Sequence, residues 1–140
     1  AKEKIQSALA ARGEEIDGII TTGYNPTIAA AAVLSEWHAK PDHKRIRYIG
    51  IDTGDTVLEA IRNGSIDATV SQNPFGHGYI SCTILAKMAA GWTPKEEYQF
   101  IDAGHVIVTK ENLDTYAAEV KAITDAIIAD IETKYLRPPE

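Results

Sequence analysis

Three short apolar stretches, each followed by a helical pattern, constrain the fold of this chain more than any other feature. They are IDGIITT (16–22), RIRYIGID (45–52) and IDATVSQ (66–72). Strands that alternate with helices over short connections form a parallel sheet, because a parallel connection has to cross the sheet and a helix is the usual crossover. The sequence therefore predicts an α/β fold of three layers, αβα, with helices on both faces of a mostly parallel sheet.

The helices are expected between and after these strands. Asn25 is expected to cap the second helix, and Pro26 suits its first turn because proline lacks the N–H that has no partner there. Asp55 is expected to cap the third helix. The expected helices cover 1–12, Asn25 to Pro41, Thr56 to Asn63, 75–91 and 112–135, and extended segments are expected at YQFID (98–102) and HVIVT (105–109).

Composition excludes several classes of function. The 140 residues carry a net charge of -6 without a basic cluster, which argues against a nucleic-acid partner because phosphate contacts need grouped Lys and Arg. No run approaches the roughly 20 apolar residues of a membrane span. Cys82 is the single cysteine, so an internal disulfide is excluded, and its apolar surroundings predict a buried, inert thiol.

Polar residues follow all three predicted strands, in TTGYN, GIDTGD and VSQNP. Because ligands bind beyond the carboxyl ends of parallel strands, these residues are candidates for a site. Each has a second interpretation: Asn25 as a helix cap, Asp52 as an Asx-turn residue that ends its strand, and Gln72 as a partner for turn backbone groups. From the residues alone, both interpretations stay open.

No catalytic or metal-binding set stands out. Asp52 and Asp55 suggest magnesium, but no upstream acidic pair or downstream strand-end lysine completes that pattern. GIDTGD lacks the third glycine of a dinucleotide fingerprint, and neither Ser71 nor Ser81 has the context of a nucleophile. The four histidines show no ligand spacing: His38, His43, His77 and His105. The sequence thus predicts no metal, no cofactor and no enzyme activity.

Three blocks of the chain resemble a known family. IDGIITTGYNPTIAAAAVL, IRYIGIDTGDTVLEAIRNGSIDATVSQNPFGHGYISCTIL and FIDAGHVIVTKENLD are similar to the C-terminal half of type I periplasmic sugar-binding proteins, the ribose-binding-like receptors of ABC importers. The resemblance implies two α/β lobes joined by three crossovers, with a sugar between them. It also implies an incomplete chain: 1–72 in the second lobe, 73–97 as a helix packing on the first lobe, and 98–140 as a return strand and terminal helix.

The resemblance implies roles for four residues. Asn25 would hydrogen-bond ligand hydroxyls, Asp52 would accept hydrogen bonds from two hydroxyls, and Gln72 would contact the ligand at the hinge. Tyr24 would add a stacking or hydroxyl contact that the usual family member lacks. Family members commonly have Asp where this chain has Pro26, so a second acceptor is absent there. A carboxylate suits the role of Asp52 because charge-assisted hydrogen bonds are about twice as strong as neutral ones.

The function implied is that of the solute-binding component of an ABC sugar importer. Its partners would be a sugar or polyol and the membrane subunits of the transporter. It would be located in the periplasm, or outside the cell with a lipid anchor. The alternative is the effector-binding domain of a lactose-repressor-type transcription regulator, which shares the fold. Without a first lobe, the helix at 75–91 is expected to expose Ile80, Ile84 and Met88 and to cover them by self-association or by domain exchange.

Overall fold

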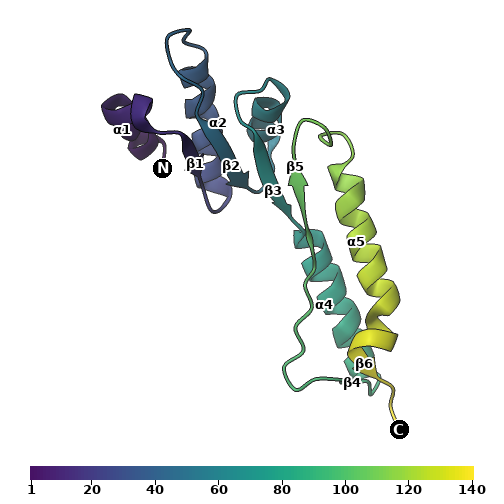
Figure 1. Ribbon diagram of the computed structural model, residues 1–140. Coiled ribbons are helices and arrows are strands. Elements are labelled where there is room, and N and C mark those ends of the chain that lie inside the picture. Colours follow the sequence, from purple (N-terminus) through teal and green to yellow (C-terminus); the bar gives the residue numbers. More distant parts are fainter. The chain divides into compact units, whose positions relative to one another are not determined.

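The computed structural model describes all 140 residues and divides into two compact units. Unit 1 comprises Ala1–Ser71 and Ile107–Asp114, and unit 2 comprises Gln72–Val106 and Thr115–Glu140. Figure 1 traces the elements of both along the chain.

Unit 1 is built from the alternation of strands and helices that the sequence predicts. Its elements are α1 (Lys2–Arg12), the 3₁₀ turn η1 (Gly13–Glu15), β1 (Gly18–Ile20), α2 (Tyr24–His38), β2 (Arg47–Ile51), α3 (Asp55–Arg62) and most of β3 (Ala68–Gln72). β1 pairs with β2 in parallel, with Ile19 opposite Tyr48. β2 pairs with β3 in parallel, with Gly50 opposite Thr69. The mostly parallel sheet is therefore confirmed, and its strand order is β1-β2-β3-β5, with β5 at His105–Val108.

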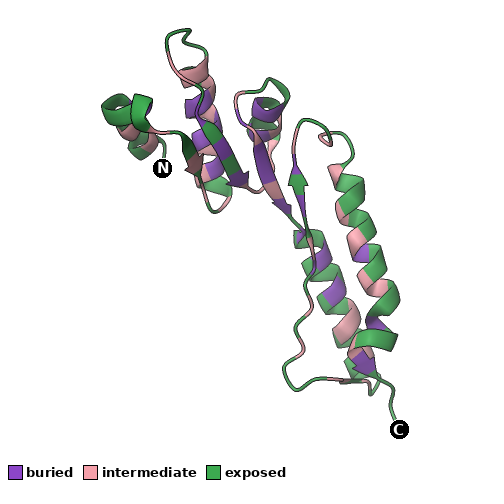
Figure 2. Cartoon of the chain, viewed as in Figure 1, coloured by how far each residue is buried: buried purple, intermediate pink, exposed green.

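The two faces of the β1–β2 pair differ in burial. Tyr48 and Gly50 are buried on the face that α2 covers, because Thr27 of α2 lies against Gly50. Ile20 and Ile49 lie on the other face and are 76% and 47% exposed. The alternation along β2 is visible in Figure 2. A parallel sheet buries both faces when it is fully covered, so this part of the sheet has one helical layer, formed by α2 and α3.

The starts of α2 and α3 correct two predicted caps. α2 begins at Tyr24 with Gly23 as its N-cap, and Gly23 has a φ of 108°. This left-handed backbone favours glycine, so the helix begins one residue before Asn25, which lies in its first turn. α3 begins at Asp55 with Gly54 as its N-cap and no side-chain capping bond. Neither Asn25 nor Asp55 is therefore a cap, and both predictions were wrong.

Unit 2 is a pair of helices joined by a small sheet. α4 (Pro74–Ala89) lies beside α5 (Tyr116–Asp130), and α5 continues into a π-helical turn, η2 (Ile131–Tyr135). β4 (Thr93–Pro94) pairs antiparallel with β6 (Leu136–Arg137). The buried core residues are Ile80, Ala103, Ile131 and Leu136. No helix of the chain combines the length and the apolar character needed to cross a membrane.

Several elements of unit 2 differ from the sequence prediction. The segment 98–102 is not a strand; Ile101 packs against the core cluster there, while Tyr98 and Phe100 are exposed. The last helix begins at Tyr116 and not at Asn112. The strands β4 and β6 have two residues each, which is too short for a period-two pattern to appear in the sequence.

Asn73 connects three parts of unit 2 and is 1% exposed. Its Oδ1 accepts from the Gly76 N–H at 2.8 Å and so caps α4. Its Nδ2 donates to the Ala103 carbonyl at 2.7 Å and to Oγ1 of Thr124 in α5 at 2.8 Å. A Cβ on Gly76 would lie 2.1 Å from Nδ2, so this arrangement also requires glycine three residues after Asn73.

The exposed face of α4 is not the one predicted. Ile80 is 4% exposed and Ile84 packs partly buried against the same core, whereas Met88 is exposed. Cys82 is exposed as well, because a residue two positions after Ile80 points to a different side of the helix. The expectations of an exposed Ile80 and of a buried thiol were therefore wrong.

Candidate functional site

The residues after β1 and β2 gather at the carboxyl edge of the sheet, because these parallel strands end on the same side. Thr21 to Gly23 follow β1 and lead into α2, and Asp52 to Gly54 follow β2 and lead into α3. These are the two connections in which sequence reasoning placed Tyr24, Asn25 and Asp52. The edge of unit 1 is therefore built from two strand–helix connections side by side.

A chain of three buried or half-buried hydroxyls lies beneath these connections. The hydroxyl of Tyr48, which is fully buried, bonds Oγ1 of Thr21, and Oγ1 of Thr21 lies 2.9 Å from Oγ1 of Thr27. Thr27 in turn donates to the Gly23 carbonyl at 2.8 Å. Because each hydroxyl has one proton, the donors must run in one direction, from Tyr48 to Thr21 to Thr27 to the carbonyl.

Thr27 joins the start of α2 to the end of β2. Besides the bond to Gly23, its Oγ1 accepts from the backbone N–H of Ile51 at 3.1 Å. One proton donated and two accepted bonds satisfy the hydroxyl completely. This residue is fully buried and fixes the spacing between the two connections. Sequence reasoning missed it, because a threonine inside a helix gives no local signal of such a role.

Asp52 adopts a backbone conformation that is rare for a residue with a side chain. Its φ is 75°, and it is the one residue other than glycine in the chain with a positive φ. Asp and Asn tolerate this left-handed region better than other side chains do. The neighbouring strand β3 binds both backbone polar groups of Asp52. The Asp52 N–H donates to the Val70 carbonyl at 2.8 Å, and Thr69 Oγ1 donates to the Asp52 carbonyl at 2.7 Å.

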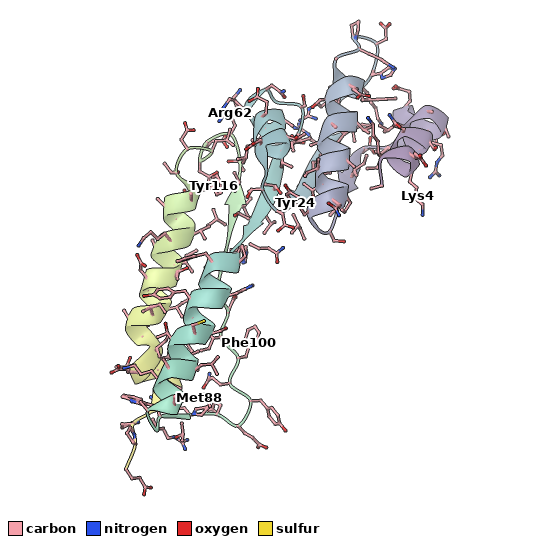
Figure 3. All side chains as sticks on the ribbon, turned by 180° about the vertical axis from the view of Figure 1, so that it is seen from behind. Lys4, Tyr24, Arg62, Met88, Phe100 and Tyr116 are labelled. Carbon is pink, nitrogen blue, oxygen red and sulfur yellow. The ribbon has the colours of Figure 1, made fainter.

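Tyr24 reaches from the first connection to the second. Its ring packs on the N-cap of α3, because a Cβ on Gly54 would lie 3.1 Å from the Tyr24 hydroxyl oxygen. The side chain remains 49% exposed, and Figure 3 labels it at the start of α2. Tyr24 and the turn after β2 are thus brought together, and a larger residue at Gly54 would displace the phenol.

The other two predicted site residues have less contact with this arrangement. Asn25 is exposed in the first turn of α2. Gln72 is exposed at the last position of β3 and belongs to unit 2. No group of three or more His, Cys, Asp or Glu side chains could hold a metal ion. Within unit 1, the candidate site therefore consists of Tyr24, Asn25 and Asp52 on a base of buried hydroxyls.

Ion pairs and a histidine gather around the residues that precede β2 and β3. Asp67 accepts from the Tyr48 N–H at 2.8 Å and from Arg47 at 2.8 Å, and it pairs with Arg45 at 3.1 Å. Burial by itself raises the pKa of Asp67, but these hydrogen bonds outweigh it and hold the pKa below its ordinary value. Burial, together with the neighbouring Arg45 guanidinium, lowers the pKa of His38.

One cavity of the protein does not coincide with the candidate site. Its volume is about 550 Å³, and it lies between α1, η1 and α2, where Trp37 and His43 contribute to its wall. None of Tyr24, Asn25, Asp52 or Gln72 lines it. The candidate site is therefore separate from this cavity.

The chain belongs to the periplasmic binding protein domain family, whose model matches residues 1–93. The match covers all of the strand–helix connections described above. Comparison with curated proteins found no match.

Solved structures with the same fold are solute receptors of bacteria. A sugar-binding protein of a sugar ABC transporter from Bacillus halodurans is 30% identical, with a TM-score of 0.66 over 82% of this chain and 41% of that one. An ABC transporter solute-binding protein from Agrobacterium vitis, solved with bound D-fucose, is 25% identical, with a TM-score of 0.69 over 85% and 39%. A glucose-galactose binding protein from Geobacillus stearothermophilus is 24% identical, with a TM-score of 0.66 over 81% and 38%. The chain thus spans about two fifths of the length of these structures.

Proposed function

We propose that this chain supplies part of the sugar-binding site of the solute-binding component of an ABC importer, in the periplasm or anchored outside the cell. The observation that carries the proposal is Asp52 at the carboxyl edge of the sheet. Its backbone N–H and carbonyl each hydrogen-bond to β3, and the residue is held in a left-handed conformation. Rare backbone conformations persist where surrounding structure enforces them and concentrate at functional sites. Membership of the periplasmic binding protein domain family supports it further.

The site residues would divide the recognition of a polyhydroxylated ligand among them. The Asp52 carboxylate accepts hydrogen bonds from two sugar hydroxyls, and the amide groups of Asn25 and Gln72 each donate and accept. The ring of Tyr24, which is half exposed, covers an apolar face of the sugar. A neutral ligand is consistent with the similar solved structures, which include a solute-binding protein with bound D-fucose and a glucose-galactose binding protein.

The proposed receptor has a second lobe formed by residues 1–72 and a first lobe to which residues 73–97 attach. Residues 98–140 then provide the return strand and the terminal helix. In that organisation the ligand lies between the two lobes, and the membrane subunits of the transporter are the protein partners. The division into unit 1 and unit 2 near Ser71 and Gln72 supports the first of these boundaries.

Amide chemical-shift mapping tests the proposal on the chain itself. The ¹⁵N-labelled protein is titrated with D-arabinose, D-fucose, D-galactose and D-glucose, with glycerol as a control for non-specific effects. We expect saturable shifts for at least one sugar at Tyr24, Asn25, Asp52 and Gln72, and none around Trp37 in the cavity between α1 and α2. Shifts that stay linear for every sugar, or that centre on Trp37, would refute this site.

A further inference from the structure

Thr69 in β3 makes a hydrogen bond that lies outside the sheet ladder. Its side chain is fully buried, and its Oγ1 donates to the carbonyl of Asp52 at 2.7 Å. Thr69 lies opposite Gly50 in the parallel register, in which Ile51 opposite Val70 is the last pair. The hydroxyl therefore reaches past the last paired residue of β2 and bonds the first residue after it.

This bond and one ladder bond hold the two peptide groups on either side of the Asp52 Cα atom. The N–H of Asp52 belongs to the preceding peptide group and donates to the Val70 carbonyl at 2.8 Å. Its carbonyl belongs to the following peptide group and accepts from Thr69. Because peptide groups are planar, fixing both of them fixes φ and ψ between them. The direction of the Asp52 Cβ atom, and with it the origin of the carboxylate, is then fixed as well.

The peptide group before these two is also held by a threonine. The N–H of Ile51 donates to Oγ1 of Thr27 at 3.1 Å, so three successive peptide groups have a partner in α2 or β3. Both threonines are fully buried. All of the partners belong to unit 1, and the arrangement is therefore complete within this unit and uses no exposed surface.

We propose that Thr69 is a positioning residue for sugar binding, which holds the peptide group after Asp52 so that the carboxylate is directed at the ligand. The inference rests on the proposed function and adds to it a residue that touches no ligand, since its side chain is buried. Hydrogen bonds weaken steeply as they bend, so a carboxylate that accepts from two sugar hydroxyls has to keep its direction. If part of the molecules lose this direction, the apparent affinity falls by the same factor.

The left-handed backbone makes this hold necessary. At a φ of 75°, Asp52 has a conformation that residues with a side chain adopt at a cost. An unbound peptide group after Asp52 would let the residue relax to an ordinary negative φ, and its carboxylate would then point elsewhere. A purely structural Thr69, which only satisfies a buried carbonyl, would instead affect the stability of unit 1 and leave the sugar affinity of the folded chain unchanged.

Two substitutions of Thr69 separate these roles. Thr69→Val keeps the shape and removes the donor, and Thr69→Ser keeps the donor. The ¹⁵N-labelled variants are titrated with the sugar that shifts the unaltered chain, at a temperature where circular dichroism shows every variant folded. We expect roughly tenfold weaker affinity for the valine variant, the effect of one lost hydrogen bond, and near-normal affinity for the serine variant. Thr69→Ala supplies the same comparison if the valine variant does not fold.

The backbone of Asp52 gives a second measurement, which a change of stability alone does not alter. A positive φ brings the amide proton of a residue close to its own Hα atom and produces a strong nuclear Overhauser effect between them. We expect this signal in the unaltered chain and in Thr69→Ser, and a weaker signal in Thr69→Val. The control is Thr124→Val, because Thr124 is equally buried but belongs to unit 2, where it accepts from Asn73 at 2.8 Å. It should lower the thermal stability and leave the signal and the sugar affinity unchanged.

The contradicting outcomes are distinct. Equal sugar affinity of Thr69→Val and the unaltered chain, or a strong Asp52 signal in the valine variant, would overturn the proposal and leave the proposed function intact. An equal loss of affinity in Thr124→Val would assign the effect to general destabilisation and would also overturn it. An unaltered chain without saturable shifts for any sugar would refute the proposed function, and with it this role of Thr69.

Discussion

The hydroxyl of Thr27 accepts the backbone N–H of Ile51 at 3.1 Å and donates to the carbonyl of Gly23 at 2.8 Å. One buried side chain in α2 therefore connects the end of β2 to the residue that starts α2. The two connections that carry Tyr24 and Asp52 are held at a fixed spacing by this bond pair. The candidate site consequently depends on a residue that lies beneath it.

Thr27→Val is expected to destabilise unit 1 by about 1–3 kcal/mol, because valine keeps the shape and leaves the buried donors without a partner. Thr27→Ser is the control. It keeps the hydroxyl and removes the methyl group that packs on Gly50, a change of about 1 kcal/mol. Urea unfolding followed by circular dichroism measures both. A serine variant less stable than the valine variant would contradict the role given to the hydroxyl.

Substitutions at Asp52 separate its backbone role from its proposed ligand role. Asp52→Gly removes the carboxylate but suits the positive φ, whereas Asp52→Ala places a Cβ in a region that costs about 1–2 kcal/mol. We expect the alanine variant to be less stable than the glycine variant by roughly 1 kcal/mol. Both should lose the sugar-dependent chemical shifts. Asp52→Asn should keep the stability and weaken the binding less.

Two outcomes for these three variants would contradict the roles given to Asp52. Equal stability of the alanine and glycine variants would show that the left-handed conformation at Asp52 is not maintained. Normal sugar-dependent shifts in the glycine variant would show that the carboxylate is only a turn residue, which is the other interpretation of the sequence.

Asn73→Asp is expected to destabilise unit 2 more than Asn73→Ser does. Aspartate keeps the acceptor for Gly76 but cannot donate to Ala103 or Thr124, and it buries a charge without a partner. Such a change costs about 3–5 kcal/mol by analogy with broken buried pairs. Serine keeps a capping oxygen. Thermal unfolding of both variants measures the difference, and an aspartate variant as stable as the unaltered chain would show that the two donor bonds contribute little.

Stability between about pH 7.5 and pH 5.5 should depend on His38. Its Nε2 accepts the Ile46 N–H at 3.0 Å and its Nδ1 bonds the Ser65 carbonyl at 2.8 Å, so the neutral ring satisfies both. The folded pKa lies below the ordinary value of 6.5 because of burial and then Arg45, with Asp67 as the opposing charge. As the pH falls, His38 is therefore protonated at a higher pH in the unfolded chain than in the folded chain.

The stabilisation from His38 is accordingly complete above about pH 6.5 and is lost as the pH falls through the lower folded pKa. Urea midpoints at about pH 7.5 and 5.5 should show this decrease, and His38→Gln should reduce it. An identical decrease in the glutamine variant would assign the effect to other groups.

The strands of unit 1 could be predicted from sequence because each is apolar, short and followed by a helix. That pattern also gave the parallel pairing and, through it, the shared edge of Tyr24 and Asp52. The helix starts were mispredicted by one residue because Asn25 and Asp55 are good capping residues. Before α2, Gly23 also has a left-handed backbone that no pattern of side chains reveals.

The remaining features depend on contacts between distant residues. Thr27 meets Ile51 only after folding, and Asn73 reaches Thr124 across 51 positions. The inner face of α4 was misassigned because Ile80, Ile84 and Met88 form one apolar pattern and Phe75, Tyr79 and Leu85 form another. A helix with two apolar faces gives no periodic signal of which one is buried. The ligand roles of Tyr24, Asn25, Asp52 and Gln72 stay predictions.

The left-handed backbone at Asp52 also limits how this protein can diversify. Glycine, asparagine and aspartate are the residues that this conformation accepts at little cost, and of these aspartate alone brings a negative charge. Few substitutions at this position are therefore compatible with the turn. Tyr24 and Asn25 lie in an ordinary helical turn, where nearly every residue type is permitted. Under the proposed function, new preferences among solutes would accordingly arise by change at the start of α2, while the acceptor after β2 stays the same.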